Sequence, residues 1–223
     1  MATLTPQELA RHIDHTLLKP EATARDIERL CAEARQHGFH AVCVPGSRVI
    51  QARHLLEDTD VKVATVAGFP LGHGDPDSKR FEVEAAIDNG AQEIDVVLNI
   101  GRLKERDDAY VLRELRDVVE AADERVVKVI LETGLLTRDE IERACHLVLD
   151  TGARFVKTST GFGPGGATVE DVKRLREWVG PKFGVKAAGG IRDTQAALAL
   201  IEAGANRIGT SAGAAIVTGV GAS

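Results

Sequence analysis

The chain has 223 residues, of which 43% are hydrophobic and 28% are charged, and its formal net charge is −6. This composition is typical of a folded globular protein, and the length suits one domain over residues 1–223. The acidic balance argues against nucleic-acid binding, which favours basic patches, and no apolar run approaches the roughly 20 residues of a membrane-spanning helix.

The first element that the sequence predicts is a short N-terminal helix. Thr5 with Glu8 matches the capping box that starts a helix, and Thr137 with Glu140 matches it again further along. Between and beyond these helices, one pattern recurs: a helix-like stretch, a glycine, and then a short apolar run typical of a buried parallel strand. The glycines of this pattern, which suit the left-handed position after a helix end, are Gly38, Gly90, Gly152 and Gly204.

Eight segments have the character of strands, and a helical segment follows each one. They are residues 12–17, 40–45, 61–67, 93–99, 126–132, 154–159, 184–188 and 206–210. Eight β-α units in a chain of this length predict an α/β fold of the (β/α)₈ TIM-barrel type. A doubly wound open sheet is the alternative, although the glycine-rich nucleotide signatures that usually accompany it are absent from the sequence.

Two lysines lie in segments where a lysine is costly. Lys157 is in ARFVKTSTGF and Lys186 is in FGVKAAGGI, on neighbouring strands of the predicted barrel. If both side chains point inward, repulsion between them lowers the pKa of one by roughly two units, and partial burial lowers it further. An uncharged amine of this kind can form a Schiff base with a carbonyl compound. The alternative is that both are surface residues or members of structural ion pairs.

Acidic residues within the strand-like runs need partners or roles of their own. Asp95, in EIDVVLN, could move protons through Lys186 or a water molecule, or could form a structural ion pair inside the barrel. Asp14, in HIDHTLL, is a weaker candidate of the same kind. Lys128, in VVKVILET, could be a third barrel lysine that balances the aspartates.

Glycine-rich loops follow the last three predicted strands and offer free backbone amides to an anion. Barrels often bind phosphate at the loops after strands seven and eight. These loops are residues 158–166, 188–192 and 208–211, and Thr210 and Ser211 add hydroxyl groups. A phosphate site at this end of the barrel is therefore expected.

Other polar residues are interpreted without a catalytic role. The sequence predicts that His37 and His40 are solvated beside a turn, and that the charge-rich residues 101–117 form a solvated helix face. Cys31, Cys43 and Cys145 are scattered and show no C-x-x-C spacing, so we expect free thiols and a cytoplasmic location, and Cys43 is expected to be a small core residue. The polar N-terminal residues predict no signal peptide.

At these residues the chain resembles the deoxyribose-phosphate aldolase family. The matching stretches cover nearly the whole chain in order, and the most specific are FVKTSTGFGPGGAT and GVKAAGGIR. The resemblance implies a class I aldolase, a lyase without metal or organic cofactor, that reversibly cleaves 2-deoxy-D-ribose 5-phosphate to acetaldehyde and D-glyceraldehyde 3-phosphate. Its expected partners are these small molecules and a second copy of the chain in a homodimer.

The resemblance also implies roles for individual residues. Lys157 would form the Schiff base, Lys186 would lower the pKa of Lys157 and take part in proton transfer, and Asp95 would donate and accept protons. Asp14 and Lys128 would contact the substrate. The residues expected around the phosphate are Gly161, Gly189, Gly190, Gly209 and Ser211.

Two departures from the family pattern are visible. Ala212 stands where relatives often carry a second serine, and residues 216–223 contain no tyrosine, whereas some relatives end in a tyrosine tail that assists proton exchange. Two other functions are compatible with the residues: another Schiff-base sugar-phosphate aldolase, such as a transaldolase-like enzyme, or a catalytically inert barrel that senses phosphate.

Overall fold

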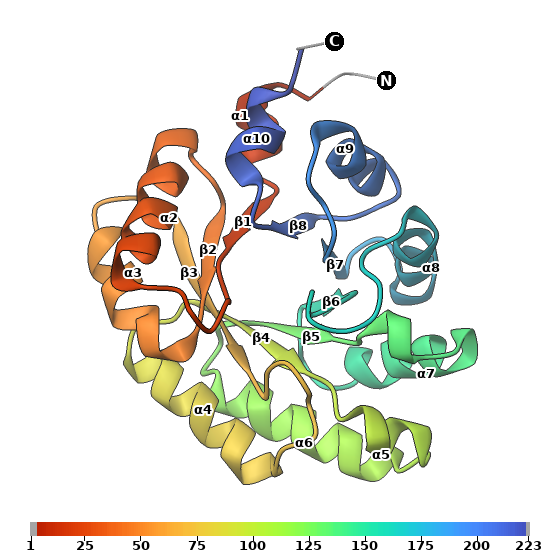
Figure 1. Cartoon of the computed structure of the whole chain (residues 1–223). Helices are drawn as coiled ribbons and strands as arrows, with labels where there is room; N and C mark the ends of the chain where they lie inside the picture. The colour runs from red at the N-terminus through yellow and green to blue at the C-terminus, as the bar shows by residue number, and fades with distance from the viewer. Residues whose placement is uncertain (1–3, 222–223) are drawn as a thin grey trace.

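The structure is a computed structural model that describes residues 4–221. The chain folds into a closed barrel of eight parallel strands (Figure 1). The strands pair in chain order and β8 closes on β1. Their bounds are β1 Ile13–Thr16, β2 Ala41–Val44, β3 Lys62–Ala67, β4 Glu93–Val97, β5 Val126–Ile130, β6 Phe155–Lys157, β7 Gly184–Ala188 and β8 Arg207–Thr210. The predicted (β/α)₈ barrel is confirmed, and the alternative of an open sheet is wrong.

Helices surround the barrel as an outer ring (Figure 1). They are α1 Pro6–Ala10, α2 Ala24–His37, α3 Val49–Leu55, α4 Pro76–Asp88, α5 Ile100–Lys104, α6 Asp108–Ala121, α7 Arg138–Leu149, α8 Val169–Val179, α9 Thr194–Glu202 and α10 Gly213–Thr218, with 3₁₀ turns η1 Gly46–Arg48 and η2 Thr133–Leu135. The capping boxes at Thr5 and Thr137 are present. None of the helices within residues 4–221 is long and apolar enough to cross a membrane.

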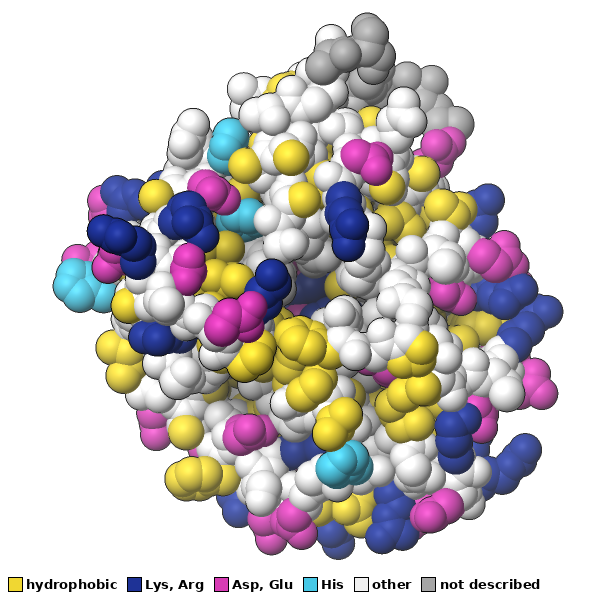
Figure 2. Space-filling view, viewed as in Figure 1, with side chains coloured by type: hydrophobic (Ala, Val, Ile, Leu, Met, Phe, Trp, Pro, Cys, Tyr) yellow, Lys and Arg dark blue, Asp and Glu magenta, His cyan; other side chains and the backbone are white. Residues whose placement is uncertain are grey.

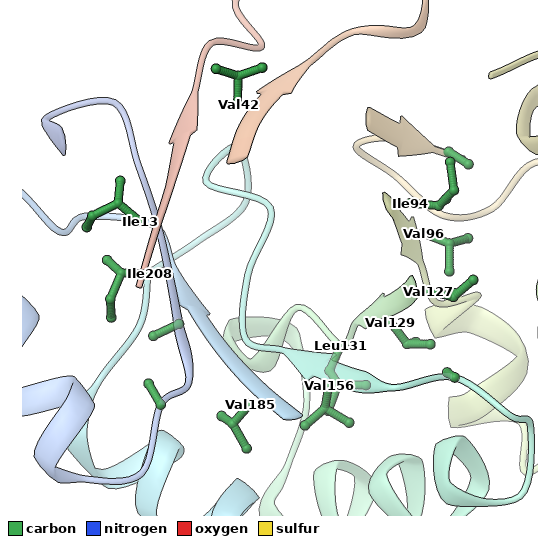
Figure 3. Packing of buried hydrophobic residues seen from close by; sticks show 14 of the residues in the cluster. Ile13, Val42, Ile94, Val96, Val127, Val129, Leu131, Val156, Val185 and Ile208 are labelled. Carbon is green, nitrogen blue, oxygen red and sulfur yellow. The ribbon is translucent and has the colours of Figure 1, made fainter. Parts of the chain in front are cut away.

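Alternate residues of each strand face two different environments. Outward-facing side chains such as Ile94, Val96 and Val129 pack against the helices and form the main apolar core (Figure 3). On β4 the residues that alternate with Ile94 and Val96 are Glu93 and Asp95, which face the barrel interior and meet charged groups from other strands. The period of two along a strand therefore separates an apolar shell from a charged centre.

The interior also contains a small apolar cluster on one side. Ala41 and Cys43 on β2 and Ala64 on β3 are fully buried there. Cys43 is thus a small core residue, as the sequence predicts, and its thiol faces the same interior as the charged groups. Because these side chains are short, they leave room for the long lysine side chains that enter from the opposite strands.

Two predictions about solvated polar residues are wrong in part. His40 is half-buried, and its Nε2 lies 3.2 Å from Oε1 of the buried Glu93. Within residues 101–117, Glu114 on α6 is buried and accepts a hydrogen bond from Lys79 of α4 at 2.7 Å. Neither pairing was visible in the sequence, because the partners are 53 and 35 residues apart along the chain.

Candidate active site

Lys157 and Lys186 are direct neighbours across the β6–β7 ladder. Lys157 ends β6, and its register partner on β7 is Lys186. Both amines reach Oδ2 of Asp95, which is 2.8 Å from Lys157 Nζ and 2.7 Å from Lys186 Nζ. The two nitrogens are therefore no farther apart than the sum of these two short distances. The structure brings together the three residues that the sequence proposes as catalytic.

Lys186 is held as a cation. Its Nζ also donates a hydrogen bond to Oδ2 of Asp14 on β1 at 2.5 Å, and Asp14 accepts a second bond from Nε of Arg207 at 2.8 Å. Burial disfavours the charge on Lys186, but the carboxylates of Asp14 and Asp95 outweigh this effect and raise its pKa well above the ordinary value. Lys186 thus places a fixed positive charge beside Lys157.

Lys157 has the opposite tendency. Burial is the main cause that lowers the pKa of Lys157, because its ammonium form loses hydration, and the cation of Lys186 lowers this pKa further. The carboxylate of Asp95 opposes both effects without overcoming them. From the sequence, repulsion by Lys186 is expected to lower the pKa of Lys157 more than burial does. The structure reverses that order, because the closed barrel leaves only 3% of Lys157 exposed.

Lys128 is the third lysine around the same carboxylate. Its Nζ lies 2.8 Å from Oδ1 of Asp95 and 2.6 Å from Oε2 of Glu93. Burial works against the charge on Lys128, but these two acids raise its pKa. Burial also works against the charge on Asp95, yet the three lysines around it hold its pKa well below the usual range. Asp95 is therefore a carboxylate in the resting site.

The charges inside the barrel do not balance if every group is ionised. Among the described residues, the interior holds more buried basic than acidic side chains: Lys128, Lys157, Lys186 and Arg207 against Asp14, Glu93 and Asp95. Loss of one proton from the basic groups restores neutrality. Of the four, only Lys157 has a lowered pKa. Of the basic groups in this interior, Lys157 is therefore the one that gives up its proton most readily.

A cavity of about 360 Å³ opens above these residues, at the carboxyl ends of the strands. The face of the molecule shown in Figure 2 is hollowed near its centre. Lys157 lines this cavity, whereas Lys186, Asp95, Asp14 and Lys128 do not. The lining includes all five residues that the sequence places around a phosphate, namely Gly161, Gly189, Gly190, Gly209 and Ser211. A molecule in the cavity can thus meet the Lys157 amine directly, and the other charged groups lie beneath it.

Glycines are required at particular points of the cavity wall. A Cβ atom on Gly166 would lie 2.4 Å from the carbonyl oxygen of Gly189, so the loops after β6 and β7 approach closely only because both residues lack side chains. A Cβ atom on Gly209 would lie 3.1 Å from Cε of Lys186 and 3.0 Å from Cβ of Ala188. Gly209 therefore leaves the space that the Lys186 side chain occupies.

The loop after β6 is fixed from below by an acid. Glu132 is 3% exposed, and its carboxylate accepts hydrogen bonds from the hydroxyl and the backbone N–H of Thr160. A Cβ atom on Gly163 would lie 2.8 Å from Oε2 of Glu132. The loop that carries Gly161 and Phe162 into the cavity lining is thus held on a buried carboxylate.

Several residues of the site have no role predicted from the sequence. Thr16 and Lys19 line the cavity but were not singled out from the sequence, and Arg192 lines it at the end of the expected phosphate loop 188–192 without having been assigned a role there. Glu93 and Arg207 join the buried ion pairs beneath it. Both could have been found from the period of two along a strand, because Glu93 precedes Asp95 by two residues and Arg207 precedes Gly209 by two.

A closed (β/α)₈ barrel with a buried lysine in the lining of a cavity at the carboxyl ends of its strands has the architecture of a barrel enzyme. The model of the DeoC/LacD family aldolases matches residues 9–219, and the chain belongs to this family.

Curated relatives and solved structures agree with this assignment. Deoxyribose-phosphate aldolase from Alkaliphilus oremlandii is 56% identical over 210 residues, which is 94% of this chain and 95% of that protein. Deoxyribose-phosphate aldolase from Thermococcus gammatolerans is also 56% identical, over 95% of this chain and 96% of that one. The solved aldolase QR15 has a TM-score of 0.91 at 39% identity, covering 95% of each chain. Tetrameric deoxyribose phosphate aldolase from Aeropyrum pernix has a TM-score of 0.90 at 35% identity, covering 96% of this chain and 92% of that one.

Proposed function

We propose that the chain is a class I aldolase that reversibly cleaves 2-deoxy-D-ribose 5-phosphate to acetaldehyde and D-glyceraldehyde 3-phosphate. The observation that carries this proposal is the environment of Lys157. Of the four basic side chains buried in the described barrel interior, it is the one whose pKa is lowered and the one that reaches the cavity. The names of the relatives supply the substrate, since curated proteins 55–57% identical to this chain are called deoxyribose-phosphate aldolases.

The reaction begins when the uncharged Nζ of Lys157 attacks the aldehyde carbon of the open-chain sugar. Loss of water gives an iminium ion, which withdraws electrons from the next carbon. The bond between the second and third carbons then breaks. The hydroxyl on the third carbon gives its proton to a base and becomes the aldehyde of glyceraldehyde 3-phosphate, and the bonding electrons form an enamine on Lys157. Protonation of the enamine carbon and hydrolysis of the imine release acetaldehyde and the free amine.

Asp95 and Lys186 supply the proton transfers in this scheme. Asp95 is a carboxylate that already touches the amine of Lys157 and the ammonium of Lys186, so a proton can pass among the three groups. Neither Asp95 nor Lys186 lines the cavity. Protons therefore pass between these two residues and the substrate through Lys157 or through one water molecule.

Asp14 and Lys128 are predicted from the sequence to contact the substrate, and Lys128 is also predicted to balance the aspartates. Both are fully buried and neither lines the cavity. We propose that they act through their ion pairs, Asp14 by holding Lys186 and Lys128 by holding Asp95, and that direct contact with the substrate is made by the cavity lining instead.

The phosphate of the substrate is proposed to bind where the glycine-rich loops meet. The lining there offers the backbone amides of Gly189 and Gly190, the hydroxyl of Ser211 and the guanidinium of Arg192. Ala212 contributes no hydroxyl at the next position. The aldehyde end of the sugar would then point down toward Lys157.

Reductive trapping tests the proposal. Acetaldehyde with borohydride should add one ethyl group to Lys157, as peptide mass spectrometry would show, and the Lys157→Leu variant should stay unmodified. Trapping only by larger keto sugars would instead indicate another Schiff-base aldolase. Failure of every carbonyl compound to be trapped would indicate an inert phosphate-binding barrel.

A homodimer and a cytoplasmic location stay predictions. The Aeropyrum pernix relative is described as a tetramer, so the assembly of this chain needs its own measurement. Light scattering of the purified protein across a range of concentrations distinguishes monomer, dimer and tetramer.

A further inference from the structure

Two buried charged residues lie one layer below the proposed catalytic groups. Glu93 is on β4, two residues before Asp95, and Arg207 is on β8, two residues before Gly209. A strand rises about 3.3 Å per residue, so this layer is roughly 7 Å farther from the cavity. Nη2 of Arg207 donates to Oε2 of Glu93 at 2.5 Å, and neither residue lines the cavity above. Direct contact between these two residues and a substrate is therefore excluded.

Each of the two residues holds one neighbour of the catalytic groups. Oε2 of Glu93 lies 2.6 Å from Nζ of Lys128, which binds Asp95 from the other side. Nε of Arg207 lies 2.8 Å from Oδ1 of Asp14, which binds Lys186. The ion pairs form a closed ring, because the chain from Glu93 through Lys128, Asp95, Lys186, Asp14 and Arg207 returns to Glu93. Lys157 is attached to this ring through Asp95.

The charged and titratable groups that face Lys157 are therefore known for the described residues. Beneath and beside it they are Asp14 (β1), Cys43 (β2), Glu93 and Asp95 (β4), Lys128 (β5), Lys186 (β7) and Arg207 (β8), and His40 meets Glu93 from outside the ring. Lys19 and Arg192 line the same cavity as Lys157, and the buried carboxylate of Glu132 accepts hydrogen bonds from Thr160 of that lining. Glu93 and Arg207 have opposite charges and belong to the same ring of ion pairs, so they should influence the Lys157 amine in opposite directions.

We propose that Glu93 and Arg207 are a pair of positioning residues that set the net charge around Lys157 through Lys128 and Asp14. This inference rests on the proposed function, since it concerns the amine that forms the Schiff base. Glu93 favours a proton on Lys157, and Arg207 disfavours it. Because their charges cancel, the two residues together do not change the excess of one positive charge in the fully ionised interior. The loss of one proton from Lys157 removes that excess.

The test is the pH dependence of imine formation in the full chain. Acetaldehyde and cyanoborohydride are added across a series of pH values, and the initial rate of ethylation of Lys157 is measured by mass spectrometry. Glu93→Gln removes a negative charge, so its midpoint should move to lower pH. Arg207→Gln removes a positive charge, so its midpoint should move to higher pH. The expected shift is about one pH unit, as for a unit charge roughly 10 Å away at an effective dielectric of about 20.

Three further variants serve as controls. Arg207→Lys keeps the charge and should keep the midpoint near that of the original protein. The double variant Glu93→Gln/Arg207→Gln should return the midpoint toward the original value. Asp60→Asn changes an exposed charge just before β3 and should leave the midpoint unchanged.

A purely structural role has a different signature. In that case the substitutions lower the amplitude of trapping or the melting temperature without the predicted shifts in the pH midpoint. The proposal is overturned if every midpoint stays in place, or if the midpoints of both single variants move in the same direction. Each single variant tests the direction of the midpoint shift independently. If one of them fails to fold, the other still decides the question. Absence of trapping in the original protein is a separate outcome, which contradicts the proposed function itself.

Discussion

Lys157 and Lys186 share one oxygen of Asp95 but have opposite acid–base behaviour. The difference follows from what else each lysine touches. Lys186 has a second carboxylate, Asp14, at 2.5 Å, and its pKa is raised. Lys157 has no second acid within bonding distance among the described residues, and burial lowers its pKa. The barrel thus holds side by side one lysine whose positive charge is stabilised and one whose positive charge is destabilised.

Replacing Lys157 with leucine should abolish aldolase turnover while the chain still folds. The substitution removes the proposed nucleophile, and it also removes the cost of burying an amine. Asp95 keeps Lys128 and Lys186 as partners, so its carboxylate is not left unpaired. The measurements are the cleavage rate of 2-deoxy-D-ribose 5-phosphate and the melting temperature. Turnover that persists above background would show that another group forms the imine.

Replacing Lys186 with leucine should move the pH midpoint of imine formation upward by about two pH units. The cation at Lys186 lowers the pKa of Lys157, so its removal lets Lys157 keep its proton to higher pH. The Asp14 carboxylate that Lys186 neutralised adds to the same effect. The measurement is the rate of borohydride trapping against pH. An unchanged midpoint would show that burial alone lowers the pKa of Lys157.

The fold was predictable because its signals are local and repeated. Each glycine at a helix end and each apolar strand lies within about ten residues of its neighbours in the chain, and eight such units allow few architectures. The strand limits differ by one or two residues at their ends, as for β6, which was expected over 154–159 and spans Phe155–Lys157.

The site was predictable only in part, because ion pairs join distant strands. Lys157 and Lys186 were detectable as lysines within apolar runs. The partners Glu93 and Arg207 are 114 residues apart, and no local pattern links them. The order of the effects on the pKa of Lys157 depends on burial in the closed barrel, which a sequence does not give. Charged side chains inside the barrel were thus predictable, whereas the ion pairs that they form were not.

Gly209→Ala should lower turnover by about tenfold or more, because a small misplacement of a catalytic group is costly. The new methyl group would press on Cε of Lys186 and on Ala188, and the flexible lysine would shift away from Asp14 and Asp95. Gly46→Ala is the matched control, since a Cβ atom there meets nothing within 4 Å. Steady-state kinetics of both variants, with circular dichroism to check folding, test this. Equal activity of the two would mean that Lys186 tolerates displacement.

The stability of the folded chain should fall in acid through the buried carboxylates. Burial alone would raise the pKa of Glu93. This effect is outweighed by the cation of Lys128, the hydrogen bond from His40 and the cation of Arg207, which lower the pKa from 4.5 to about 2. A lowered pKa stabilises the folded state above pH 4.5, and this contribution disappears as the pH falls toward 2. For Glu93 the loss is about 3 kcal/mol. Urea unfolding at a series of pH values measures it. Glu93→Gln should show a smaller acid-induced loss than the original protein, and an identical loss would contradict this assignment.

Lys79 on α4 and Glu114 on α6 form a buried ion pair. We expect that removing one of the two charges destabilises the fold much more than removing both. Nζ of Lys79 lies 2.7 Å from Oε1 of Glu114 and 3.0 Å from the carbonyl oxygen of Val97, at the end of β4. Lys79→Met leaves the Glu114 carboxylate buried without its cation, so we expect a loss of about 3–5 kcal/mol in the free energy of unfolding. Lys79→Met/Glu114→Leu replaces both charges by apolar groups and should recover most of that loss. Urea unfolding of the two single variants and the double variant gives the coupling between the residues. If the double variant is as unstable as the sum of the single ones, the two side chains contribute independently and the pair has no special role.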